Sequence, residues 1–275
     1  GFFVTSNADQ SNTMVWQVRL NGMVPEWTRI FSTSEQVVAL EIDVETKQIF
    51  LALCSGGMPC TQGRIISNNA GTYPTRQNQL TQVVYTSQNS VANCIPNGMA
   101  LDEANKQLIV HCLFATSRGL LAMRYNGSNQ FQIGGVPCQN VLSINSQLAV
   151  FKNNLFCMDL QHIFYIFMEG GAGHLRWRQV GAFDATDLTP RSILIDPSAN
   201  AVSIVTSSER QSKSIVLMYN TFIESIIGYS ERYINTNVIH QFQLRQAMQC
   251  PTNCNLQGVC VDIFTTQEKS EENQK

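Results

Sequence analysis

Residues 40–51 read LEIDVETKQIFL, and the same pattern returns at residues 100–110 (ALDEANKQLIV) and 194–204 (LIDPSANAVSI). In each copy an apolar run ends in an aspartate and a short polar turn follows. A second apolar run then begins six residues after the aspartate. Two strands joined by a tight polar turn form a β-hairpin. Repetition of such a unit along a chain is typical of propellers and other repeat arrays.

The hairpins recur at a nearly constant interval. The first apolar residues of the second strands are Phe2, Ile49, Leu108, Leu155 and Val202. These positions are separated by 47, 59, 47 and 47 residues, and the long interval contains a polar insertion at residues 68–79. Two further apolar runs follow each second strand, so every complete unit contains four expected strands. Four strands in about 40–50 residues is the size of a propeller blade.

We therefore predict an all-β fold, a β-propeller of four-stranded blades over residues 1–247. Five blades can be counted, and a sixth would require a unit before Gly1 or one that the pattern does not reveal. The chain begins with a second strand at Phe2, whereas residues 238–244 (VIHQFQL) are a first-strand candidate with no second strand after them. We expect this C-terminal strand to close the ring by completing the N-terminal blade, because closure removes exposed sheet edges.

The segments that decide the family are residues 1–6, 18–22 (VRLNG), 37–50, 96–108 and 148–159, and residues 238–246 leading into 250–260 (CPTNCNLQGVC). In these segments the chain resembles the YWTD β-propellers of the low-density lipoprotein receptor family, followed by a partial EGF-like module. The YWTD tetrapeptide itself is absent, and that family usually has six blades. The resemblance implies a propeller, then a partial EGF-like module over residues 248–264. The polar, charged residues 265–275 are expected to form a flexible tail.

Nine cysteines indicate an oxidising compartment. Cys94 and Cys112 lie 18 residues apart, and Cys138 and Cys157 lie 19 apart at comparable places in the next blade. Pairing of antiparallel first and second strands brings such positions within bridging distance. A local bridge between Cys54 and Cys60 would close the short turn between them. The alternative is a set of independent buried thiols, which are common in protein cores.

Three cysteines follow the propeller, namely Cys250, Cys254 and Cys260, and they have the spacing of the first half of an EGF-like module. The resemblance implies a Cys250–Cys260 bridge and leaves Cys254 without its usual partner in this chain, so Cys254 is a candidate for an intermolecular bridge. A zinc site is the rival interpretation, but no histidine lies near these cysteines in the sequence.

Composition and motifs argue against several functions. Charged residues make up 14% of the chain, and the formal net charge is −2, so we expect no nucleic-acid binding. There is no run of 18 apolar residues, and we expect no membrane-spanning segment. We find no G-x-S-x-G elbow, Walker loop or H-E-x-x-H motif, and predict no catalytic residue, no metal and no cofactor. The rival is a metal-dependent propeller hydrolase of the gluconolactonase type, whose Glu, Asn and Asp ligands we cannot assemble here.

The recurring aspartates, Asp43, Asp102 and Asp196, admit two interpretations. A ring of carboxylates around a central channel could hold a cation. Alternatively, each aspartate accepts backbone hydrogen bonds and shapes the turn that follows it. We favour the turn role, because two of the blades lack the aspartate.

One segment suggests binding, and another suggests modification. Arg176, Trp177 and Arg178 lie in a fourth strand on the outer rim, where alternation separates the tryptophan from the two arginines. Arg and Trp are enriched in binding hot spots, although charges on an edge strand also deter unwanted pairing.

Asn126 begins an N-G-S sequon in an expected turn and is a predicted glycosylation site. We predict a non-enzymatic extracellular or secreted propeller, a receptor ectodomain or matrix-type protein or a fragment of one, that binds or assembles with a protein partner.

Overall fold

The computed structural model describes residues 2–6, 13–21, 24–56, 60–68, 80–89, 93–114, 118–134, 148–151, 154–158, 162–168, 176–182, 188–196, 201–208, 213–220 and 225–232. Over these residues the strands form five antiparallel sheets, and a single short 3₁₀-helix, η1 (Ser87–Asn89), accompanies them. The predicted EGF-like module at residues 248–264 and the tail at 265–275 lie outside the described residues.

The sheets follow one another along the chain, and within each sheet neighbouring strands are consecutive in sequence. The first contains β1 (Phe2–Ser6), β2 (Thr13–Asn21) and β3 (Val24–Thr33). The second contains β4 (Gln36–Asp43), β5 (Gln48–Ser55), β6 (Gln62–Ser67) and β7 (Gln82–Thr86). The third contains β8 (Ile95–Asp102), β9 (Gln107–Leu113), β10 (Arg118–Arg124) and β11 (Phe131–Ile133). The fourth contains β12 (Leu148–Phe151), β13 (Asn154–Met158), β14 (His162–Phe167) and β15 (Arg176–Ala182). The fifth contains β16 (Leu188–Asp196), β17 (Ala201–Ser208), β18 (Lys213–Asn220) and β19 (Ser225–Arg232).

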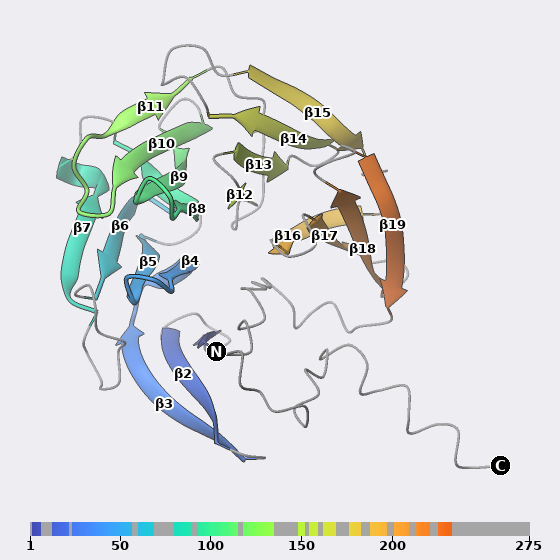
Figure 1. Ribbon diagram of the computed structural model, residues 1–275. Coiled ribbons are helices and arrows are strands. Elements are labelled where there is room, and N and C mark those ends of the chain that lie inside the picture. Colours follow the sequence, from blue (N-terminus) through green and yellow to red (C-terminus); the bar gives the residue numbers. More distant parts are fainter. Residues whose placement is uncertain are drawn as a thin grey trace.

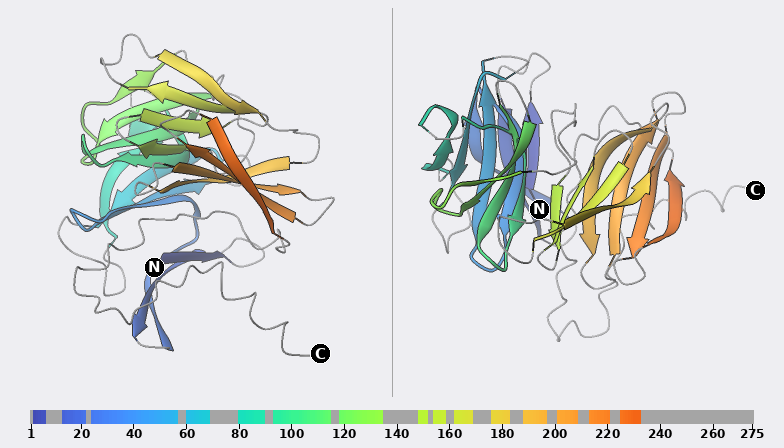
Figure 2. Two further views of the ribbon diagram at one scale, coloured as in Figure 1. Left: turned by 45° about the vertical axis from the view of Figure 1, so that its right-hand side comes forward. Right: turned by 90° about the horizontal axis from the view of Figure 1, so that it is seen from above.

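The five sheets are the blades of a propeller. Their first strands lie toward a common axis, and β3, β7, β11, β15 and β19 form the outer rim (Figures 1 and 2). Along the inside, β4 contacts β8, β8 contacts β12, and β12 contacts β16. This confirms the predicted all-β propeller of four-stranded blades. In the described part of the first blade, β1 is the innermost strand, and the strand expected to close it, at residues 238–244, lies outside the described residues.

The turn role of the recurring aspartates is confirmed in the second and third blades. Asp43 and Asp102 each accept, through Oδ1, a hydrogen bond from the backbone N–H three residues further on, at 2.9 and 3.1 Å. One residue after each of these amides, Lys47 and Lys106 take up left-handed backbone conformations, with φ of 55° and 51°. Asp196 ends β16 opposite Ala201, as expected from the hairpin pattern.

The blades also share β-bulges that the sequence pattern does not reveal. Each bulge leaves one extra residue on one strand, which bends that strand and increases its twist. In three first strands the extra residue lies five positions before the aspartate of the turn. The extra residues of the first strands are Val38, Asn97 and Arg191. The extra residues of the outer strands are Ile30, Val84, Val180 and Ile227.

The hydrophobic core lies between successive blades. One cluster joins the first and second blades, a second joins the second and third, and a third joins the third and fourth. Inner strands are therefore covered on both faces, and β5 reads QIFLALCS with every residue but the last buried. This two-sided burial explains why the second strands are continuous apolar runs and do not alternate.

Two of the predicted disulfides are present. Cys54 bridges Cys60, with Cα atoms 5.8 Å apart, and Cys94 bridges Cys112, with Cα atoms 4.9 Å apart. Cys157, on β13, is also disulfide-bonded, while its expected partner Cys138 lies outside the described residues. Cys250, Cys254 and Cys260 lie outside them as well.

In the part of the chain that the structure describes, no helix has the length and apolar character needed to cross a bilayer.

Candidate functional site

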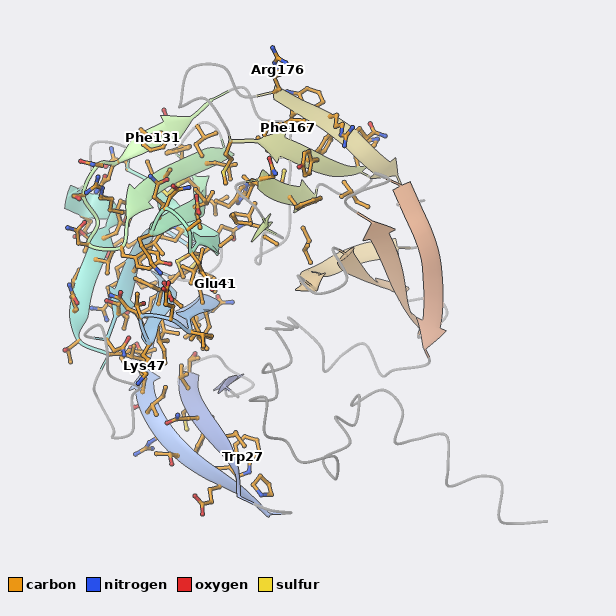
Figure 3. The ribbon with its side chains drawn as sticks, in the orientation of Figure 1. Trp27, Glu41, Lys47, Phe131, Phe167 and Arg176 are labelled. Atoms are coloured by element: carbon orange, nitrogen blue, oxygen red, sulfur yellow. A yellow bond between two sulfur atoms is a disulfide. The ribbon has the colours of Figure 1, made fainter. Side chains whose placement is uncertain are left out.

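The predicted binding residues lie on β15, the outermost strand of the fourth blade. Arg176, at the start of this strand, is labelled in Figure 3. β15 pairs with β14, and the register places Trp177 opposite Ile166, Arg178 opposite Tyr165, and Arg176 opposite Phe167. Because paired residues share a face of the sheet, Trp177 lies on one face and the two arginines on the other. The alternation expected from the sequence is therefore confirmed.

Trp177 is exposed but held in place. Its side chain is 48% exposed, while its ring meets that of Phe164 edge to face, with centroids 5.7 Å apart and planes at 87°. Phe164 is buried and belongs to the cluster between the third and fourth blades. The indole thus has one side against the core and the other available for contact, so little side-chain entropy remains to be lost on binding.

Apolar side chains continue this surface toward the third blade. Phe131 on β11 and Met168 at the end of β14 are partly buried against the same cluster as Phe164. We call Phe131, Met168, Arg176, Trp177 and Arg178 the rim surface. Its apolar members, Phe131, Met168 and Trp177, pack on the cluster between the third and fourth blades, whereas Arg176 and Arg178 lie on the other face of β15. Figure 3 labels Phe131 on the third blade and Arg176 on the fourth.

The two arginines of the rim surface differ in their surroundings. Arg176 is exposed at the start of β15. Arg178 is half-buried, and its guanidinium lies 5.3 Å from the ring centre of Tyr165 and 5.7 Å from that of Phe167. Cation–π contacts of this kind are worth about 0.5–2 kcal/mol, depending on how far the cation is desolvated. Arg178 is therefore fixed by the blade, whereas Arg176 is presented to solvent.

The aromatic stack beneath Arg178 was not predicted. Tyr165 meets Phe167 edge to face at 4.6 Å and Phe156 at 4.8 Å between ring centres. The available signal is the β14 sequence HIFYIF, in which Tyr165 and Phe167 are two residues apart and therefore share a face.

A small pocket of about 90 Å³, lined mainly by polar residues, lies elsewhere, at the end of the second blade that carries η1. Arg64 forms a bidentate ion pair with Glu35 on its wall, with Nε donating to the two carboxylate oxygens at 3.2 and 3.0 Å. Gly63 N–H donates to Ser87 Oγ at 3.0 Å. The charges in this pocket thus compensate each other.

Asp43 does more than shape its turn, because it joins the second blade to the third. Its buried Oδ2 accepts hydrogen bonds from Lys106 Nζ at 2.9 Å and from the Tyr125 hydroxyl at 3.0 Å. Burial by itself raises the pKa of Asp43, but the hydrogen bonds from Thr46 N–H, Lys106 and Tyr125 outweigh it and hold the pKa below its usual value. Burial by itself lowers the pKa of Lys106, but the hydrogen bonds that Lys106 donates to Glu45 and Asp43 outweigh it and raise the pKa above its usual value. The sequence did not predict this link.

Among the described residues, no three His, Cys, Asp or Glu side chains are close enough to hold a metal ion. His111 is fully buried on β9, with Nδ1 3.5 Å from Asn97 Nδ2, and His162 lies beside Phe164 at the start of β14. His174 and His240 lie outside the described residues.

Asn126 lies where the sequence predicted, in the turn between β10 and β11, and its side chain is exposed. The turn is compact: Gly127 N–H donates to Arg124 C=O at 2.8 Å, and Arg124 N–H donates to Ser128 C=O at 2.9 Å.

Comparison with known proteins finds no protein-family model that matches the chain, and no curated protein matches it. Among solved structures, the chain is similar to one from the crystal structure of a nidogen/laminin complex, with a TM-score of 0.55 and 8% identity over 88% of this chain and 97% of that one. It is also similar to a quinonprotein alcohol dehydrogenase-like protein from Bacteroides thetaiotaomicron (TM-score 0.53, 8% identity, 83% of this chain and 54% of that one). A third is a candidate 6-phosphogluconolactonase from Bacteroides uniformis, with a TM-score of 0.51 and 11% identity over 83% of this chain and 66% of that one. At these identities the likeness shows the propeller fold alone.

Proposed function

We propose that this protein is an extracellular β-propeller, a receptor ectodomain or matrix-type component, that binds a protein partner through the rim surface and is not an enzyme. The observation that carries the proposal is Trp177, which is 48% exposed while its ring is anchored against Phe164. Exposed apolar groups that are gathered and rimmed by polar residues mark interaction sites. Here Trp177 lies on an edge strand, and its sequence neighbours Arg176 and Arg178 present charge from the other face of that strand.

The residue types of the rim surface suit a protein partner. Tryptophan and arginine are enriched among the few interface residues that supply most of the binding free energy. Aromatic residues and methionine are enriched in interfaces as well, and Phe131 and Met168 supply them here. The matching partner surface would have an apolar pocket for the indole and a carboxylate for Arg176. Because the Trp177 ring and Arg178 are already packed, binding needs little reordering of the strand.

Two further observations support the proposal, the first its extracellular location and the second its binding to a protein. The disulfides Cys54–Cys60 and Cys94–Cys112 are typical of secreted and cell-surface proteins. One structurally similar chain comes from a nidogen/laminin complex, which is an assembly of proteins. The finer assignment, to the YWTD type with an EGF-like continuation, rests on the sequence resemblance alone.

The test compares two exposed tryptophans. Wild type, Trp177→Ala and Trp27→Ala are immobilised and incubated with extracellular fluid from the source organism, and the bound proteins are quantified by mass spectrometry. Trp27 is the matched control, because it is 53% exposed and lies on β3, an outer strand in another part of the rim (Figure 3). We expect a protein that is retained by wild type and Trp27→Ala and lost from Trp177→Ala.

Two results would contradict the proposal. One is a set of bound proteins that Trp177→Ala leaves unchanged. The other is stoichiometric calcium or zinc in the native protein together with lactonase or esterase turnover that chelation abolishes, which would identify a metal-dependent propeller hydrolase instead.

A further inference from the structure

We propose that Asn126 carries an N-linked glycan and that this glycan covers the outer edge of β7 in the neighbouring blade. The inference rests on the extracellular location in the proposed function, and it does not involve the rim surface. Three features of the structure carry it: the geometry of the sequon, the contact between its turn and β7, and the absence of charge on β7.

The sequon is presented in a defined turn. Asn126 Oδ1 accepts hydrogen bonds from Ser128 Oγ–H at 2.7 Å and from Ser128 N–H at 3.1 Å. Both bonds use the carboxamide oxygen, and neither uses Nδ2, the atom that would carry the sugar. Asn126 and Ser128 are exposed, so the folded protein leaves room for a glycan at this position.

The chemistry needs one co-reactant, an oligosaccharide joined to a lipid diphosphate. Asn126 Nδ2 loses one hydrogen as a proton and forms a bond to the anomeric carbon of the oligosaccharide. The bond between that carbon and the diphosphate breaks, and the lipid diphosphate leaves with the electron pair.

The turn that carries Asn126 lies against β7 of the second blade. Gly127 has a φ of +81°, and a Cβ at this position would lie 1.9 Å from the carbonyl oxygen of Val84. Only glycine allows so close an approach of the two backbones. Since consecutive Cα atoms are about 3.8 Å apart, the Cα atoms of Asn126 and Val83 lie within roughly 15 Å of each other. A glycan on Asn126 therefore starts beside β7.

β7 is the outer strand that needs such cover. Edge strands can pair with other chains, and proteins prevent this with charges, proline, β-bulges or very short strands. The other outer strands have such protection: β3, β15 and β19 each contain charged residues, and β11 has only three residues. β7, with the sequence QVVYT, has a bulge at Val84 like those of β3, β15 and β19. Unlike those strands it has no charge, and its Val83 is 53% exposed. We assign the protection of this edge to the glycan.

The first test measures the mass of the full chain secreted from eukaryotic cells. We expect wild type to exceed its polypeptide mass of 30.7 kDa and to return to it when N-glycosidase removes the sugar. Asn126→Gln and Ser128→Ala should be secreted at the polypeptide mass, while the matched variant Ser128→Thr, which keeps the sequon, should stay heavier. Wild type at 30.7 kDa, or excess mass that persists in Asn126→Gln, would overturn the proposal.

The second test measures protection of the edge by light scattering at equal protein concentrations. Asn126→Gln should aggregate several-fold more than wild type. Adding Val83→Lys to it should restore the wild-type level, because lysine on an edge strand deters pairing. Equal scattering from wild type and Asn126→Gln, or failure of the lysine to rescue, would overturn the protective role. Neither test involves Trp177, so failure here is distinct from failure of the proposed partner binding.

Discussion

Removing the hydroxyl of Tyr125 tests the link between the second and third blades. In Tyr125→Phe the ring contact with Phe50, at 4.7 Å between centroids, can persist, while the 3.0 Å hydrogen bond to Asp43 is lost. A hydrogen bond to a charged group contributes about 1.5–3 kcal/mol. We expect the free energy of unfolding to fall by that amount at neutral pH. A larger loss is not expected, because Lys106 and the backbone N–H of Thr46 still bind the carboxylate.

The pH dependence of this loss gives a sharper test. The pKa of Asp43 is lowered in the folded protein. The ionised carboxylate therefore stabilises the fold fully when the pH is above the pKa of Asp in the unfolded chain, about 3.9. That stabilisation disappears as the pH falls through the folded pKa. In Tyr125→Phe the folded pKa lies closer to the unfolded one. The difference in stability from wild type should therefore be full at neutral pH and shrink below about pH 3.9.

Tyr85→Phe is the matched control. The Tyr85 hydroxyl donates to Cys94 C=O at 2.9 Å and accepts from Cys94 N–H at 3.0 Å, so it has neutral partners only. Loss of this hydroxyl should lower the free energy of unfolding by about 1–3 kcal/mol, both at neutral pH and below about pH 3.9. Both variants are compared with wild type by urea unfolding followed by tryptophan fluorescence. A Tyr125→Phe variant as stable as wild type at neutral pH, or destabilised to the same extent at both pH values, would refute the role of Asp43.

Two further predictions concern the ring and its bridges. Deleting the chain from residue 236 onward removes residues 238–244, the expected partner of β1, and should lower the melting temperature; an unchanged melting curve would refute closure by that strand. Replacing Cys94 and Cys112 together by serine should cost about 2–4 kcal/mol of unfolding free energy. Peptide mapping without reductant should recover these two cysteines joined, and free thiols there would remove the main argument for an extracellular location.

The features predicted correctly from the sequence are local ones. Asp43 and Asp102 mark hairpin turns because their carboxylates bind amides only three residues away. The apolar runs around them give the strands, and their spacing gives the blades. Trp177 and the two arginines lie on different faces of the sheet because side chains alternate along β15.

The features that were missed depend on contacts between distant parts of the chain. The bond from Tyr125 to Asp43 joins residues 82 apart, in different blades. The extra residues Val38 and Asn97 occupy the same place in β4 and β8, but valine and asparagine share no property that marks a bulge. A bulge is a property of the register between two strands, and a single strand's sequence does not contain that register.

The measurement that tests the central claim most directly is the affinity of the captured partner, once purified, for three forms of the protein. Loss of a binding hot spot costs at least about 2 kcal/mol, which is roughly a 30-fold increase in Kd. We predict that increase for Trp177→Ala and a Kd close to that of wild type for Trp27→Ala, with both variants folded by their melting curves. An unchanged Kd for Trp177→Ala, or an equal weakening by both substitutions, would contradict binding through the rim surface.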